Sequence, residues 1–89
     1  MKEPNTNSKN KSNKSTCIIL ATLKVRECIF SEYLHHSFYE AKRRVKSWEL
    51  NGFLLLTASI KIGDEEFKPV NSYAELNVII EHEIESSSG

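Results

Sequence analysis

Glycine is scarce in this sequence, with three residues at positions 52, 63 and 89 of an 89-residue chain. A loop that cradles phosphate needs several glycines close together, so this scatter excludes a nucleotide site of that kind. No serine is framed by glycines, as it is at the sharp turn that presents a catalytic nucleophile. We therefore predict that the chain is not an enzyme and binds no cofactor.

Cysteine is equally scarce. The two cysteines, Cys17 and Cys28, are too few for a disulfide scaffold. If both lay on one extended segment they would be about 35 Å apart, at roughly 3.3 Å per residue, which is too far to bridge. We predict that both are buried free thiols in a reducing compartment, and hence that the protein is cytoplasmic.

Long apolar runs are absent as well. The longest one, residues 17–21, is far shorter than the roughly 20 residues that span a membrane. Lys24, Arg26 and Glu27 follow it, where a signal peptide would continue with apolar residues and a small-residue cleavage site. The sequence predicts neither a transmembrane segment nor a signal peptide.

The remaining composition is that of a small folded protein. Hydrophobic residues make up 39% of the chain and charged residues 27%, which is too apolar for a wholly disordered chain. Residues 1–16 are polar, carry four lysines against one glutamate, and are expected to be disordered. We predict a single domain over residues 17–85, with residues 86–89 frayed.

The net charge is zero, but the two halves of the chain differ in sign. Residues 1–52 carry ten Lys or Arg against five acids, which gives +5, and residues 53–89 carry two against seven, which gives −5. This split predicts a dipolar surface that can attract a charged partner or a second copy of the chain.

The first half of the folded region predicts a strand and a helix. Alternating apolar positions predict a strand over residues 17–25. Apolar residues then recur at steps of four and three, which predicts one stripe of a helix: Leu34, Phe38, Ala41, Val45 and Trp48. Two starts are open for this helix. It begins at residue 32 if Ser31 is the N-cap, and at residue 38 if Ser37 caps it together with Glu40. Asn51-Gly52 ends it near residue 50.

The second half predicts a β-hairpin. Residues 53–62 form a strand whose middle is expected to be buried on both sides, and therefore central, with these even positions inward: Leu54, Leu56, Ala58, Ile60 and Ile62. Gly63-Asp64 fits a two-residue turn that places Ile60 opposite Phe67. Pro69 cannot donate to a strand ladder, so the returning strand is expected to be short and at an edge.

A second helix follows the hairpin. Ser72 and Glu75 form a capping box ahead of apolar residues at helical spacing, which predicts a helix over residues 73–84. A strand over residues 77–85 is the alternative, although it would leave Ile79 exposed. The alternative strand is indicated by residues at every second position, which would share one face: Val78, Ile80, His82 and Ile84.

This order of elements predicts an α+β fold, β-α-β-β-α, with a three-stranded sheet and both helices on one face. The first two strands are expected to be parallel neighbours, joined by a right-handed helical crossover. The same order recurs in unrelated small proteins and so indicates no family.

The only residues with metal-ligand chemistry near one another are two histidines, a glutamate and the two cysteines. On a helix, His36 and Glu40 would share one face and offer two ligands, with His35 adjacent. A closed zinc site needs four ligands, and the cysteines lack the short paired spacing of such sites. We therefore predict no metal site.

A basic run is the most suggestive local feature of the chain, and its candidate binding residues are Lys42, Arg43, Arg44 and Lys46, with Tyr39 beside them. On the first helix these residues lie off the apolar stripe and face solvent, where they are placed to contact phosphates. The same residues would also interact favourably with the C-terminal end of the helix dipole or with neighbouring glutamates.

Two functional hypotheses follow. The favoured one is a non-catalytic protein-binding module, an adaptor or modulator that docks on a larger partner through an edge strand or a helix face, or associates with itself. The alternative is a nucleic-acid-contacting protein that uses the basic tail and the basic face of the first helix. The acidic second half of the chain favours a protein partner, because it would repel a duplex.

Overall fold

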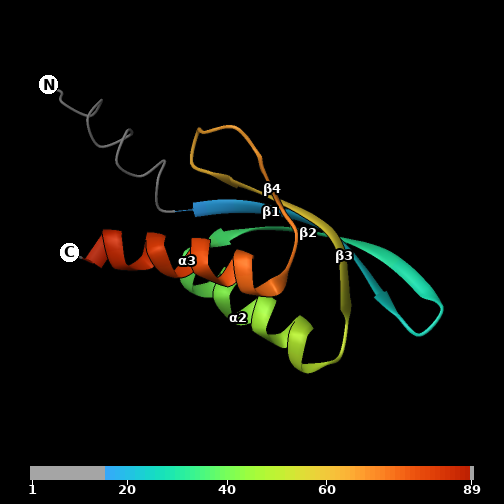
Figure 1. Ribbon diagram of the computed structural model, residues 1–89. Helices are drawn as coiled ribbons and strands as arrows, with labels where there is room; N and C mark the ends of the chain where they lie inside the picture. Colours follow the sequence, from blue (N-terminus) through green and yellow to red (C-terminus); the bar gives the residue numbers. More distant parts are fainter. Residues whose placement is uncertain (1–15, 89) are drawn as a thin grey trace, which may run out of the picture.

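The computed structural model describes residues 16–88, which form a four-stranded antiparallel sheet with two helices on one of its faces (Figure 1). The elements are β1 (Thr16–Val25), β2 (Cys28–Ser37), α2 (Phe38–Leu50), β3 (Leu54–Ile62), β4 (Lys68–Val70) and α3 (Tyr73–Ser88). The predicted α+β class is confirmed, but the sheet has four strands rather than three. The predicted tail lies outside the described residues, apart from Thr16, which begins β1.

The strand that the sequence prediction missed is β2. It pairs with β1 residue for residue along its whole length, through a tight turn in which Arg26 takes a φ of +57°. Leu34 and Phe38 are four residues apart and both are buried, so they resemble one helical stripe, but Leu34 belongs to β2 and Phe38 to α2. The early helix start at residue 32 is therefore wrong.

The later of the two predicted helix starts is correct. Ser37 is the N-cap of α2, and its Oγ accepts a hydrogen bond from the Glu40 backbone N–H at 3.3 Å. The predicted stop is also confirmed, because Gly52 adopts a φ of +79°. Its N–H donates to the Glu49 carbonyl and that of Phe53 to the Trp48 carbonyl, both at 3.1 Å, which satisfies carbonyls of the last turn.

The strands lie in the order β2-β1-β3-β4, and each neighbouring pair is antiparallel. The prediction that the first strand and the strand after the helix are parallel is therefore wrong. The extra strand explains the error, because β2 reverses the chain before α2 begins. Helix α2 then carries the chain back along the sheet, and β3 runs opposite to β1.

Strand β3 is central, as predicted, but its inward register is broken by a β-bulge. Thr57 pairs with Thr22 while Leu55 pairs with Leu23, so Leu56 has no counterpart on β1. The bulge turns Leu55 toward the core and leaves Leu54 and Leu56 exposed, contrary to the predicted inward set. The prediction of burial on both sides is also wrong, because the helices cover only one face (Figure 1).

The connection between β3 and β4 is wider than predicted. The Glu65 N–H donates to the Ile62 carbonyl at 2.9 Å, and residues 63–67 form the turn. Ile60 consequently faces Lys68 rather than Phe67. Strand β4 has three residues, includes Pro69 and lies at an edge, as predicted.

The core lies between the sheet and the two helices. The buried stripe predicted for α2 is confirmed at Phe38, Ala41, Val45 and Trp48. The sheet and α3 supply the remaining buried apolar side chains: Cys17, Ile19, Ala21, Leu23, Leu34, Ala58, Ile60, Ile62, Val70, Leu76 and Ile80. Below the β1–β2 turn, Phe30 and Phe53 meet edge to face with ring centroids 5.4 Å apart.

Helix α3 replaces the alternative strand and extends to Ser88, beyond the predicted end at residue 84. Ser72 Oγ accepts from the Glu75 N–H at 3.1 Å, and Glu75 Oε1 accepts from the Asn71 N–H at 3.0 Å. The Tyr73 hydroxyl donates to the Phe53 carbonyl at 2.7 Å and ties the start of α3 to the α2–β3 connection. Burial, and secondarily the charge of Glu49, raises the pKa of Tyr73.

Within residues 16–88 no helix is both long and apolar enough to cross a bilayer.

A matched pair of leucine truncations tests this packing. Leu76 is fully buried on α3, whereas Leu50 at the end of α2 is 78% exposed. Leu76→Ala is expected to lower the free energy of unfolding by about 2–5 kcal/mol, because it leaves a cavity in the core. Leu50→Ala is expected to change it by less than about 0.5 kcal/mol. Urea denaturation measures both, and equal effects would contradict this arrangement of α2 and α3.

Candidate functional site

The five candidate binding residues, Lys42, Arg43, Arg44, Lys46 and Tyr39, all lie exposed on α2, as predicted. Two of the cations have carboxylate partners. Lys42 Nζ is 2.6 Å from Glu81 Oε2 on α3, and Arg43 Nη1 is 3.4 Å from Glu40 Oε1. Among the described residues Arg44 and Lys46 form no ion pair, so the positive charge of the run is only partly available to a ligand.

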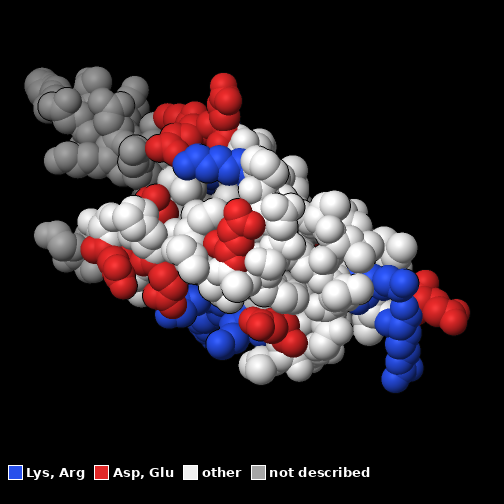
Figure 2. Space-filling view, viewed as in Figure 1, with Lys and Arg blue, Asp and Glu red and all other residues white. Residues whose placement is uncertain are grey.

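A shallow depression of about 530 Å³ lies on the same helix. It is lined by the following residues of α2 and its C-cap: Lys42, Arg43, Lys46, Ser47, Leu50 and Asn51. Figure 2 shows basic side chains gathered below α3 and acidic side chains over α3 and over the turn before β4. The predicted charge asymmetry thus appears as neighbouring patches of opposite sign.

The sheet face without helices carries the second candidate surface, which we call the open face. The register of the strands places five large apolar side chains on it: Ile18, Leu20, Ile29, Tyr33 and Leu54. Of these, Ile29, Tyr33 and Leu54 are each more than half exposed, at 61%, 64% and 58%. They form two apolar groups, with Ile18, Leu20 and Tyr33 toward one end of the face and Ile29 and Leu54 beside Lys24 toward the other. Grouped exposed apolar side chains mark interaction sites more often than isolated ones do.

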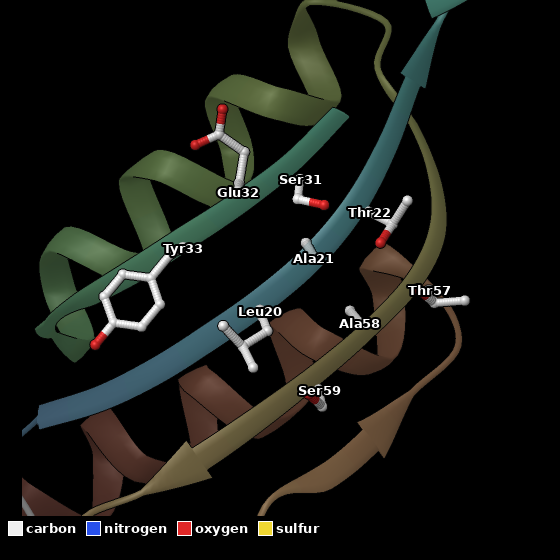
Figure 3. A pocket seen from close by; sticks show the side chains of 9 residues that line it. All are labelled: Leu20, Ala21, Thr22, Ser31, Glu32, Tyr33, Thr57, Ala58 and Ser59. Atoms are coloured by element: carbon white, nitrogen blue, oxygen red, sulfur yellow. The ribbon is translucent and has the colours of Figure 1, made fainter. Parts of the chain in front are cut away.

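An open depression of about 510 Å³ lies across the middle of this face (Figure 3). Its floor is low because the outward residues there are small hydroxyl side chains: Thr22, Ser31, Thr57 and Ser59. Leu20 and Tyr33, which are direct partners on β1 and β2, stand at one end of it (Figure 3). The depression therefore joins apolar rims to hydroxyls that can donate and accept hydrogen bonds.

The charges on the open face have one sign. Lys24 and Lys61 point outward, as does His35, and in the described strands no Asp or Glu occupies an outward position of β1, β2 or β3. Glu32 of β2 lies on the helix-covered face of the sheet, because its β1 partner, Ala21, faces the helices. The open face therefore combines apolar surface with a weakly positive potential.

The histidine arrangement differs from the one expected. His35 and His36 are neighbours on β2 and so point to opposite faces of the sheet, whereas the prediction placed His36 on a helical face with Glu40. No group of three or more His, Cys, Asp or Glu side chains within residues 16–88 is placed to hold a metal ion. His36 and Glu40 do not share a helical face, because His36 belongs to β2 and α2 begins only at Phe38.

The two cysteines lie at opposite ends of the β1–β2 hairpin, and both are free. Cys17 is buried, as predicted, and burial, with a smaller contribution from the charge of Glu83, raises the pKa of its thiol to about 11. Cys28 is exposed beside the turn, so the prediction that both are buried is wrong. Its position at the end of a projecting hairpin explains the difference.

Sequence reasoning missed the open face because it missed β2. The signal was present in the alternation of residues 28–34, where Phe30 and Leu34 face the helices and Ile29 and Tyr33 face outward. Comparisons of the chain with known protein families, with curated proteins and with solved structures find no match.

Thiol reactivity tests the placement of the cysteines. In the folded protein near neutral pH, a disulfide reagent is expected to modify Cys28 rapidly and Cys17 only on unfolding, because the buried Cys17 thiol is shielded and remains protonated. Cys28→Ser should abolish the rapid phase, and Cys17→Ser should leave it intact. Two rapid phases in the folded wild type would contradict the burial of Cys17.

Proposed function

We propose that this chain is a non-catalytic protein-binding module that docks a partner protein on the open face of its sheet. The observation that carries the proposal is a four-stranded sheet covered by helices on one side only, with large apolar side chains exposed on the other. We also propose a cytoplasmic location, supported by two free cysteines at opposite ends of one hairpin.

The chemistry of the open face specifies the kind of partner. Leu20 and Tyr33 offer an apolar anchor beside the central depression, whose hydroxyls suit backbone or polar groups of the partner. Lys24 and Lys61 lie on the same face with no outward carboxylate on β1, β2 or β3 of the described strands. We therefore propose a partner segment with apolar residues that fill the depression and carboxylates that approach the two lysines.

The proposed module acts by binding alone. Neither depression brings together a nucleophile, a base and a group that could orient the base. Cys17, whose thiol is buried and whose pKa is raised, has the opposite of the lowered pKa that activates a nucleophile.

A pair of surface substitutions tests the open face as the docking site. With the tagged 89-residue chain as bait in native lysate, Leu20→Asp is expected to reduce capture of the bound protein about tenfold, because it places a charge in the apolar anchor. Val78→Asp, at an exposed position on α3 outside both candidate surfaces, is the matched control and should retain the partner.

Urea midpoints should first show that both variants fold. Equal capture by wild type and Leu20→Asp, or loss only with Val78→Asp, would place the docking site elsewhere than on the open face. Treatment of the lysate with nuclease separates a direct protein partner from one bridged by nucleic acid.

The alternative, nucleic-acid contact, is supported mainly by Arg44 and Lys46. These are the two cations of the run that have no carboxylate partner among the described residues. If α2 contacts phosphates, replacing Lys42, Arg43, Arg44 and Lys46 together with glutamine should weaken binding and flatten its dependence on salt. Titration of a labelled oligonucleotide at several salt concentrations measures this. Unchanged affinity and slope would exclude α2 as the contact.

A further inference from the structure

The two edges of the sheet differ in a way that bears on assembly. Strand β4 is an edge of three residues that contains Pro69 and follows the acidic residues 64–66, features that discourage another strand from pairing there. Strand β2 is an edge of ten residues with no proline, glycine, lysine or arginine, and its register with β1 contains no bulge. Among the described strands β4 therefore carries several protective features, whereas the single Asp, Glu, Lys or Arg of β2 is Glu32.

The side of β2 that faces away from β1, which we call the β2 edge, has no neighbouring strand within residues 16–88. Alternate backbone N–H and C=O groups along it therefore point to solvent. A long, regular edge of this kind accepts a further antiparallel strand without any change in its own structure.

A second copy of β2 fits this edge in one register better than in its neighbours. A twofold axis perpendicular to the sheet pairs the copies antiparallel and keeps their helices on the same side. Centred on Glu32, the axis would set two carboxylates opposite each other, and centred on Tyr33 it would set each Glu32 opposite the apolar Leu34. Centred on Leu34, it sets each Glu32 opposite His36 and each Tyr33 opposite His35.

We propose that two copies of the chain associate through their β2 edges about Leu34 and form a continuous eight-stranded antiparallel sheet. The overlap covers residues 31–37, ends where α2 begins, and supplies roughly six to eight new backbone hydrogen bonds. Each imidazole of His36 donates an N–H to the Glu32 carboxylate of the other copy. By symmetry this pair forms twice.

The exposure of these side chains agrees with the register. Glu32 is half-buried and forms no ion pair with another described residue, and its carboxylate projects past β2 on the side away from β1 (Figure 3). His36 is exposed on the same, helix-facing side of the sheet. Both groups are thus available at the β2 edge for a partner strand.

Helix α2 adds positive charge on the side that faces the β2 edge. Lys42 contacts Glu81 of α3, and Arg44 lies two residues further, about 200° around the helix, on the side away from α3. Because α2 packs over β2 and β1, that side faces the β2 edge. In the pair, Arg44 of each copy lies beside the approaching Glu32 of the other, which strengthens the attraction between the copies.

The association does not depend on the proposed function, because it uses the backbone of β2 and the helix-facing side chains of Glu32 and His36, whereas a partner on the open face contacts side chains on the other side of the sheet. It also leaves that face accessible in both copies. A domain of this size gains from such an interface, because a small core supplies little net stability.

Sedimentation equilibrium of the 89-residue chain tests the association. A mass of twice 10.2 kDa that forms with rising concentration is expected. Hydrogen exchange under the same conditions should show slower exchange of β2 amides in residues 31–37 with rising concentration, and unchanged exchange in β4. A protein that stays monomeric at about 1 mM, or a dimer without protection of β2, would overturn the proposal.

A charge swap tests the register. His36→Glu sets two carboxylates opposite each other at both symmetric positions and is expected to weaken association about tenfold or more, and Glu32→His is expected to weaken it in the same direction. The double variant Glu32→His/His36→Glu restores opposite partners and should recover the wild-type dissociation constant to within about threefold. His82→Glu, at an exposed position on α3, is the control and should leave the dissociation constant unchanged.

Recovery in the double variant would establish the Leu34-centred pairing. Association that is indifferent to His36→Glu, or a double variant as weak as the single ones, would overturn it. A monomeric chain whose β2 edge instead pairs with a strand of a different protein would overturn the choice of a second copy as the occupant.

Discussion

The hydrogen-bonding of β1 on both of its sides is the constraint on which the rest of this structure depends. Its ten residues pair with β2 along one side, and residues 17–24 pair with β3 along the other, so it fixes the register of three of the four strands. Its inward residues, Cys17, Ile19, Ala21 and Leu23, are all buried beneath the helices. Since side chains alternate between faces, the same pairing sets which residues of β2 and β3 form the open face.

The parts of the fold that could be predicted are those in which a local pattern agrees with the tertiary packing. The stripe of α2 and the capping residues at Ser37 and Ser72 are local signals, and the structure confirms them. Strand β2 could not be placed in the same way. Leu34 is a buried residue of β2, and Phe38, four residues later, is a buried residue of α2. This spacing is the same as that of two buried residues on one helix, so periodicity alone could not distinguish strand from helix at Leu34.

The bulge in β3 shows a second limit of pattern reasoning. Leu54, Leu55 and Leu56 are chemically alike, so hydrophobicity cannot indicate which of them faces the core. The choice is made by pairing with Leu23 and Thr22 across the sheet, which lie more than thirty residues away in the chain. The turn before β4 is misjudged for a related reason: the connection extends over residues 63–67, and the last three of these, residues 65–67, carry no strong turn signal.

The candidate surfaces were predictable to different degrees. Exposure of the basic residues on α2 followed from the helical period, but the ion pair between Lys42 and Glu81 joins two helices distant in sequence and could be found only from their packing. The open face and the β2 edge both required knowledge of β2. Each becomes visible only after the strand order is known, because a face or an edge is a property of the whole sheet.

The close pairing of β1 with β2 has a consequence for the order in which the chain folds. The two strands are joined by a two-residue turn, so the entropy lost in closing their hairpin is small, whereas β3 can reach β1 only after the whole of α2 has been synthesised. We therefore expect the hairpin to form while the rest of the domain is still emerging from the ribosome. At that stage both of its sides are unpaired, and the later arrival of β3 shields one of them from other nascent chains.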